Sequence, residues 1–177
     1  MTTLTPAAER LLTAAGELFY TRGIHAVGVD LIAETAGTTK KTLYDRFGSK
    51  DQLVALYLRR RFERWCEFVE RWLDEHGRDP ERVLDALESW LRDNTHGCAF
   101  VNAHAEIGRA DHPAIGVVRA EKQWMRSLYE RLAGSAELGA RLHLVHEGAI
   151  IAWSVGGQAD ALDHARAAAR DLVSRAS

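Results

Sequence analysis

Residues 29–53, VDLIAETAGTTKKTLYDRFGSKDQL, contain two short segments of helical periodicity separated by one glycine. Ile32 and Ala33 lie on the apolar face of the first segment, and Leu43 lies on that of the second. Gly37 stands between them, where a tight reversal of the chain requires a positive φ that glycine adopts at little cost. Two short helices joined by so tight a turn predict a helix-turn-helix.

The second of these helices exposes hydrogen-bond donors. In a helix-turn-helix the first helix crosses the phosphate backbone of DNA and the second lies in the major groove. Residues 1–60 also carry 8 Lys and Arg against 6 Asp and Glu, whereas the rest of the chain carries 15 against 19. A basic N-terminal part fits a contact with phosphates there. The donors expected on the exposed face are Lys40, Lys41, Thr42, Tyr44 and Arg46.

The remaining sequence also shows helical periodicity, without a convincing run of strand-like alternation. Thr5 followed by Pro6 marks a helix start, and Thr39 can cap the second helix of the pair. Ser49 with Gln52 forms a capping box that opens a long helix. Later helices are expected to begin near residues 80, 98, 113, 138 and 160. The pattern predicts an all-α fold of about nine helices, three of them within the first 47 residues.

Composition excludes several classes of protein. The chain has 177 residues, of which 46% are hydrophobic and 27% charged, as in soluble globular proteins. It contains no uncharged apolar run of about 18 residues and no basic-then-apolar start, so neither a membrane span nor a secretory signal is expected. The two cysteines, Cys66 and Cys98, are too few for a disulfide framework, which suits a reducing cytoplasm.

The quoted segment resembles the TetR (tetracycline-repressor) family of transcriptional regulators. Its succession of Ile-Ala, Ala-Gly, Thr-Leu-Tyr, a Phe, and Ser-Lys before an acidic residue and Leu follows that family's pattern. LLTAAGELFYTRGIHAVGV at 11–29 is similar to the family's first helix, and GCAFVNAHAEI at 97–107 is similar to a sixth-helix segment. The resemblance implies that residues 1–48 form a DNA-binding domain and residues 49–177 a ligand-binding and dimerisation domain.

The resemblance also implies roles for individual residues. Tyr44 and Lys50 are expected to touch phosphates, and the groove-facing set is expected to be Thr39, Lys40, Thr42 and Tyr44. Two positions depart from the family's pattern. Gly28 stands where many members have a Ser or Thr that caps the second helix, and Lys41 replaces a small residue of the recognition helix. Lys41 either adds a contact or changes how closely that helix approaches DNA.

As a family member, the protein is expected to be a repressor that a small effector releases from a palindromic operator. Effector binding would favour a conformation in which the long helix that starts at Ser49 swings and changes the separation of two DNA-binding heads. No enzyme activity and no cofactor are expected, because the sequence has no nucleophile elbow, phosphate loop or zinc-protease motif.

Residues 149–157, AIIAWSVGG, are apolar around almost the whole helix, which requires burial on both sides. Small side chains there would let a second helix come close. Together with the resemblance, this favours a homodimer in which the last two helices of each copy form a four-helix bundle. The alternative is a central core helix within one chain. The expected interface residues are Ala149, Ala152, Gly156, Ala165 and Ala169.

All five tryptophans lie after residue 48 and suit either a core or a mostly apolar effector cavity. The expected effector is apolar or aromatic. The lining residues expected are Trp65, Phe68, Trp90, Phe100, His104, Trp124, Leu128 and His146.

Other interpretations remain open. His143, His146 and Glu147 lie within one helical turn and could hold a metal in a helical-bundle protein or enzyme, with Cys98 and His104 as further ligands. A di-iron bundle would need paired Glu-x-x-His motifs, which are absent. Redox sensing through the two cysteines and a helical protein that only binds other proteins are further alternatives.

Overall fold

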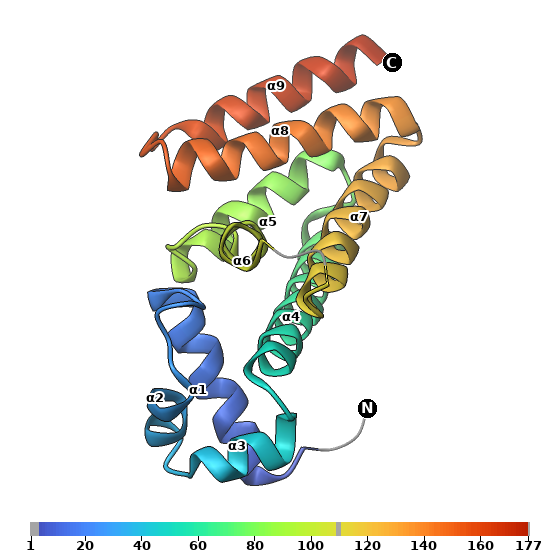
Figure 1. The fold of residues 1–177 in the computed structure, drawn as a ribbon. Helices are drawn as coiled ribbons and strands as arrows, with labels where there is room; N and C mark the ends of the chain where they lie inside the picture. The colour runs from blue at the N-terminus through green and yellow to red at the C-terminus, as the bar shows by residue number, and fades with distance from the viewer. Residues whose placement is uncertain (1–3, 109–110, 177) are drawn as a thin grey trace. The chain divides into compact units, whose positions relative to one another are not determined.

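The computed structural model describes residues 4–108 and 111–176, and all regular secondary structure in these ranges is α-helical (Figure 1). The prediction of an all-α fold is confirmed for the described residues. The helices in chain order are α1 (Pro6–Arg22), α2 (Val29–Thr35), α3 (Lys40–Phe47), α4 (Lys50–His76), α5 (Pro80–Asp93), α6 (Ala99–Ile107), α7 (Ala114–Ala133), α8 (Ala136–Ser154) and α9 (Ala161–Ala176).

Side-chain caps begin several helices where the sequence predicts them. In each case a hydroxyl oxygen accepts a hydrogen bond from an amide in the first turn, which would otherwise lack a partner. The acceptors are Thr5 for the amide of Ala8 at 3.4 Å, Thr39 for that of Thr42 at 3.1 Å, and Ser49 for that of Gln52 at 3.1 Å. These caps explain why α1, α3 and α4 start at their observed residues.

The chain divides into two compact units. Unit 1 comprises Met1–Phe62 and Ala99–Arg119, and unit 2 comprises Glu63–Cys98 and Ala120–Ser177. The boundary suggested by the sequence, after residue 48, lies inside unit 1. The reason is that the first half of α4 and all of α6 pack with the first three helices.

Two contacts illustrate this packing in unit 1. The rings of Phe19 in α1 and Tyr57 in α4 lie 5.8 Å apart. The carboxylate of Glu106, near the end of α6, accepts a hydrogen bond from the amide of His25 in the α1–α2 loop at 2.7 Å.

Unit 2 is built around an apolar core. Helices α8 and α9 run antiparallel and side by side (Figure 1), and α5 packs against α9. A Cβ added at Gly139 in α8 would lie 2.4 Å from Cα of Glu130 in α7, so this glycine permits a close approach of the two helices. None of the helices in the described ranges has both the length and the apolar character needed to cross a bilayer.

Candidate nucleic-acid interface and buried polar cluster

Helices α2 and α3 form the predicted helix-turn-helix. Ile32, Ala33 and Leu43 are almost completely buried and hold the two helices against each other. Gly37 has φ +60°, as the turn requires, and the amide of Thr38 donates to the carbonyl of Ala33 at 2.9 Å. The two short helices are therefore locked at a defined angle by packing and by the turn.

The expected DNA-contacting residues of α3 lie at its N-terminal end. Thr39, Lys40 and Lys41 are exposed, Thr42 is half-buried, and Tyr44 is 43% exposed. An exposed tyrosine on a helix whose opposite side is buried leaves both its ring and its hydroxyl available to a partner. The structure thus brings five of the six predicted residues together, with the helix dipole adding positive potential at the same end.

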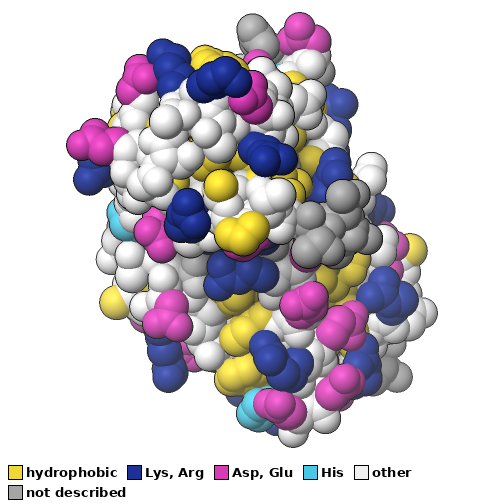
Figure 2. All heavy atoms as spheres, turned by 90° about the horizontal axis from the view of Figure 1, so that it is seen from below, with side chains coloured by type: hydrophobic (Ala, Val, Ile, Leu, Met, Phe, Trp, Pro, Cys, Tyr) yellow, Lys and Arg dark blue, Asp and Glu magenta, His cyan; other side chains and the backbone are white. Residues whose placement is uncertain are grey.

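The lysines of this surface are paired with carboxylates. Lys40 lies 3.1 Å from Asp30 in α2, and Lys41 lies 2.7 Å from Asp45 one turn later. On the face shown in Figure 2, basic side chains are interspersed with acidic ones. Exposed ion pairs contribute little to stability, so phosphates can replace these carboxylates at low cost.

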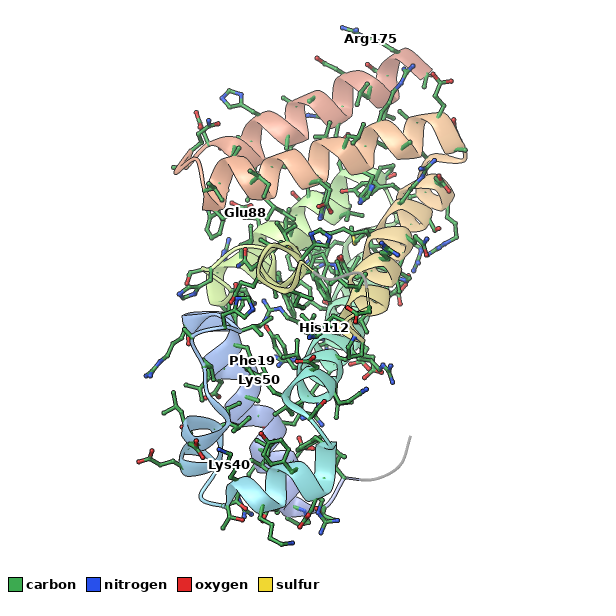
Figure 3. The ribbon with its side chains drawn as sticks, viewed as in Figure 1. Phe19, Lys40, Lys50, Glu88, His112 and Arg175 are labelled. Carbon is green, nitrogen blue, oxygen red and sulfur yellow. The ribbon has the colours of Figure 1, made fainter. Side chains whose placement is uncertain are left out.

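Lys50 occupies a different position from the other five. Its ammonium donates to the carbonyl of Ile24 at 2.5 Å and lies 6.0 Å from the centre of the Phe19 ring (Figure 3). Burial lowers the pKa of Lys50. In this structure Lys50 therefore holds the α1–α2 loop, and its expected contact with a phosphate remains a prediction.

The structure also clarifies the two departures from the family pattern. Gly28 is the N-cap of α2 and supplies no side-chain bond, yet its φ of −79° and the open space around it would accept a serine. Lys41 points into solvent, with a side chain 84% exposed. An exposed Lys41 can add a contact without forcing α3 away from DNA.

The residues expected to line an effector pocket are divided between the two units. Trp65, Phe68 and Trp90 form an aromatic group in unit 2, with Trp90 5.2 Å from each of the other two rings. Leu128 and His146 are buried in the same unit, and Trp124 is half-buried against its core. Phe100 and His104 belong to unit 1, where Phe100 packs 6.4 Å from Phe62 and His104 is exposed.

An open groove of about 340 Å³ lies on α4 and α5 of unit 2. Two expected pocket residues, Phe68 and Trp90, line it, but most of its other lining residues are charged or polar. These are Arg64, Glu67, Arg71, Ser89, Asp93 and Asn94.

A group of polar side chains lies in unit 2, where α7 and α8 contribute most of them. The ammonium of Lys122 donates to Glu147 at 2.9 Å, and His143 lies 3.4 Å from the same carboxylate oxygen. Burial by itself raises the pKa of Glu147, but His143 and Lys122 outweigh it and lower this pKa to about 2. Burial lowers the pKa of His146 to about 3, so this imidazole is neutral near pH 7.

The histidines expected as metal ligands make other contacts. His146 Nδ1 lies 3.1 Å from the hydroxyl of Tyr129, while His143 faces Glu147. Within the described part of the chain, no three His, Cys, Asp or Glu side chains are arranged to hold a metal ion. The described geometry therefore gives the metal-binding alternative no support.

The two cysteines differ in their surroundings. Burial, with the nearby carboxylates of Glu121 and Glu70, raises the pKa of Cys66 to about 12. The sulfur of Cys98 accepts a hydrogen bond from the ammonium of Lys122 at 3.5 Å. We expect iodoacetamide at pH 8 to label Cys98 well before Cys66, as measured by peptide mass spectrometry of the folded protein. Equal labelling of both thiols would contradict this difference.

The residues expected at a dimer interface are mostly internal. Ala149, Ala165 and Ala169 are buried in the core of unit 2, while Ala152 is half-buried and Gly156 exposed. The three buried alanines, one on α8 and two on α9, serve the packing of these helices within their own chain.

The exposed apolar face of α8 is a different set, which we call the α8 seam. It consists of Leu144, Gly148, Ile151 and Val155. Leu144 is 71% exposed and Val155 is 79% exposed. Sequence reasoning missed this seam, although its spacing of four, three and four residues is the pattern of helix–helix contacts.

An all-helical chain with a well-formed helix-turn-helix and exposed donors at the start of its second helix has the features of a helix-turn-helix DNA-binding protein. Residues 11–57 match the family described as "Bacterial regulatory proteins, tetR family". The structure of a TetR-family transcriptional regulator from Streptomyces coelicolor is 26% identical, with a TM-score of 0.84 over 96% of this chain and 95% of that one. Residues 11–57 therefore carry the DNA-binding region of the TetR family, and the described chain has the fold of a TetR-family transcriptional regulator.

Two further relatives define the extent of the similarity. The HTH-type transcriptional activator FasR of Mycolicibacterium smegmatis is 37% identical over 89 residues, which are 49% of this chain and 41% of FasR. The chain thus aligns with less than half the length of this relative. The reduced form of NemR from Escherichia coli is 17% identical, with a TM-score of 0.80 over 94% of this chain and 96% of that one, and shares the fold.

Proposed function

We propose that the protein is a cytoplasmic, homodimeric transcriptional regulator that binds a pseudo-palindromic operator through α3 of each copy. The observation that carries this proposal is the exposed group of donors at the N-terminal end of α3, in a chain that carries the DNA-binding region of the TetR family. Two such helices related by a twofold axis would read half-sites separated by about one turn of DNA, roughly 34–36 Å, or more.

The second copy is proposed to dock on the α8 seam. Leu144, Ile151 and Val155 would lose solvent contact, and an added Cβ at Gly148 would meet nothing within 4 Å, so the backbone is open to a neighbouring helix. A twofold contact of this kind buries the same residues from both copies.

The regulation proposed is repression that a small, mostly apolar or aromatic effector relieves. The effector must bind one conformation of the dimer more tightly than the other. Because the relative FasR is named as an activator, the direction of regulation requires its own experiment. A reporter gene behind the selected operator should be more active when the regulator is deleted, and a fall in activity would identify an activator instead.

Selection of bound fragments from a random DNA pool, followed by anisotropy titrations, tests DNA binding directly. We expect Tyr44→Ala to raise the Kd about tenfold or more on every sequence, because each dimer loses two contacts to phosphate. Lys40→Ala and Lys41→Ala should in addition change the preferred bases, and each should reduce the dependence of binding on salt.

Thr21→Ala is the matched control, because Thr21 is exposed on α1 and its hydroxyl bonds to the Glu17 carbonyl of its own helix. This variant should bind as the wild type does. If all three α3 variants bind like the control, α3 does not contact DNA. If the wild type binds no duplex even at low salt, the proposed function is wrong.

A further inference from the structure

The open groove of about 340 Å³ on α4 and α5 lies wholly within unit 2. Its volume falls near the lower end of the range in which proteins bind small molecules. Two aromatic side chains and four charged ones are among those that line it. The charged residues are Arg64, Glu67, Arg71 and Asp93. A groove with this lining can hold a ring and recognise charges on the same ligand.

The aromatic residues of the groove are held in place by neighbouring rings. The rings of Phe68 and Trp90 lie 5.2 Å apart, and both side chains are half-buried. Trp65 and Trp72 stack against Phe68, with ring centres at 6.1 Å and 6.0 Å. Phe68 and Trp90 therefore present a preformed apolar surface on which the flat ring of a ligand can pack.

The four charged residues of the groove form no ion pairs. Among residues 4–108 and 111–176, none of them has an opposite charge within 4.0 Å. Glu67 and Arg71 remain apart although their spacing of four residues often brings such side chains together on a helix. Elsewhere on the same two helices exposed charges do pair, as Arg82 does at 3.0 Å in the next turn of α5. The charges of the groove are therefore available to a ligand.

Two of these charges, on Arg64 and Asp93, lie at the same end of the aromatic pair. Arg64 precedes Phe68 by one turn of α4, and Asp93 follows Trp90 by about one turn of α5. Only residues 77–79 separate the two helices, so the chain reverses there and both steps lead away from the connecting loop. A ligand whose ring packs on the aromatic pair can thus meet a guanidinium and a carboxylate at one end.

Opposite charges at one end of an aromatic surface select a zwitterion. A guanidinium binds a carboxylate through two parallel hydrogen bonds, and a carboxylate accepts charge-assisted hydrogen bonds from an ammonium. An α-amino acid carries both of these groups on one carbon, next to its side chain. A residue at either end of a peptide retains only one of them, so a free amino acid matches the groove better than a chain end does.

We infer that the groove binds a free aromatic amino acid. Its ring packs on Phe68 and Trp90, its carboxylate binds Arg64, and its ammonium binds Asp93. The role of this amino acid as the effector rests on the proposed function, whereas binding itself requires no DNA.

Three compounds with the same phenyl body test the two charges of the ligand. Calorimetric titration of the full chain at pH 7 compares L-phenylalanine with 3-phenylpropanoate, which lacks the ammonium, and with 2-phenylethylammonium, which lacks the carboxylate. We expect L-phenylalanine to bind about fivefold more tightly than either analogue. The factor is modest because water partly screens each charged contact in an open groove.

Two variants assign the two contacts separately. Arg64→Gln should weaken the binding of L-phenylalanine about fivefold and leave that of 2-phenylethylammonium unchanged. Asp93→Asn should weaken the binding of L-phenylalanine by a similar factor without weakening that of 3-phenylpropanoate. Both residues are exposed, so the variants should remain folded, and urea denaturation verifies this. A general disturbance of the fold would not produce such a selective pattern.

Arg92→Gln and Asp171→Asn make the same changes at exposed positions outside the groove. These controls should bind all three compounds as the wild type does. Equal affinities for the three compounds, a preference that survives in both groove variants, or an equal loss in the controls would overturn the inference. The absence of L-phenylalanine binding at millimolar concentration would overturn it as well.

Operator binding, measured separately, distinguishes the two proposals. Saturating L-phenylalanine should raise the Kd for the operator about tenfold, and an unchanged Kd would refute its role as the effector. A protein that binds DNA but shows no preference for L-phenylalanine refutes this inference alone. A protein that prefers L-phenylalanine but binds no DNA refutes the proposed function.

Discussion

Leu144→Asp is expected to convert the proposed dimer into a monomer and to weaken operator binding about a hundredfold or more. Leu144 is 71% exposed in the single chain, so the protomer should tolerate the change. In the proposed dimer the same substitution would bury two carboxylates in an apolar contact, which costs several kcal/mol unless they are paired. Since a monomer holds only one α3, it also loses the gain from simultaneous binding to two half-sites.

Light scattering coupled to size exclusion measures the mass of the variant, and anisotropy measures its affinity for the operator. Ser127→Asp is the control, because it places the same residue at an exposed position in the interior of α7 and costs the helix a similar amount. The control should remain dimeric. A dimeric Leu144→Asp variant with full operator affinity would show that α8 does not form the interface.

Lys122→Met is expected to lower the free energy of unfolding by about 3 kcal/mol at pH 7. Removing the ammonium leaves Glu121 and Glu147 without their shared counter-ion, and a buried pair that loses one partner costs about 3–5 kcal/mol. We expect the lower end of this energy range because the side chains of Lys122 and Glu147 each remain about a quarter exposed. Urea denaturation followed by tryptophan fluorescence, at fixed protein concentration, measures the loss.

The loss should depend on pH in a defined direction. The pKa of Glu147 is lowered to about 2 in the folded wild type, so its stabilising contribution is complete above its ordinary pKa of 4.5 and disappears as the pH falls toward 2. In the variant this carboxylate loses the ammonium, keeps only His143 as a partner and takes up a proton more readily. The difference in stability between the two proteins should therefore be nearly constant above about pH 4.5 and should shrink as the pH falls from there toward 2.

Two further variants show whether the lost interaction with Glu147 causes the destabilisation of Lys122→Met. Adding Glu147→Gln to Lys122→Met should restore part of the lost stability, because one uncompensated charge is removed. Lys41→Met deletes an exposed ion pair of α3 and should change stability by less than about 0.5 kcal/mol. If Lys122→Met is as harmless as Lys41→Met, the cluster does not hold unit 2 together.

The helix-turn-helix was predictable in detail because its determinants are local. A cap at Thr39, a positive φ at Gly37 and the buried faces of α2 and α3 all follow from residues within about twenty positions of one another. Such features depend on backbone geometry and on helical periodicity, which a sequence displays directly. The exposed donors of α3 are also predictable, because they lie on the face of the helix opposite its buried residues.

Other expectations required contacts between distant segments. The family resemblance implied a phosphate contact for Lys50, which stays a prediction, but it did not indicate that the ammonium donates to the carbonyl of Ile24, 26 positions earlier. It also suggested that small residues such as Ala149 and Ala165 face a partner, yet both pack inside unit 2. Periodicity identifies the apolar side of a helix but does not say which neighbour covers it.

The order and type of the helices and the helix-turn-helix were determined by the sequence itself, since short-range rules of capping, turns and periodicity decide them. Tertiary structure alone decided that Lys122 stands between Glu121 and Glu147, that α6 packs with the first three helices, and that the α8 seam stays uncovered. These features depend on contacts between segments that are far apart in the sequence. The packing of the whole chain determines such contacts, and no short stretch of it does so alone.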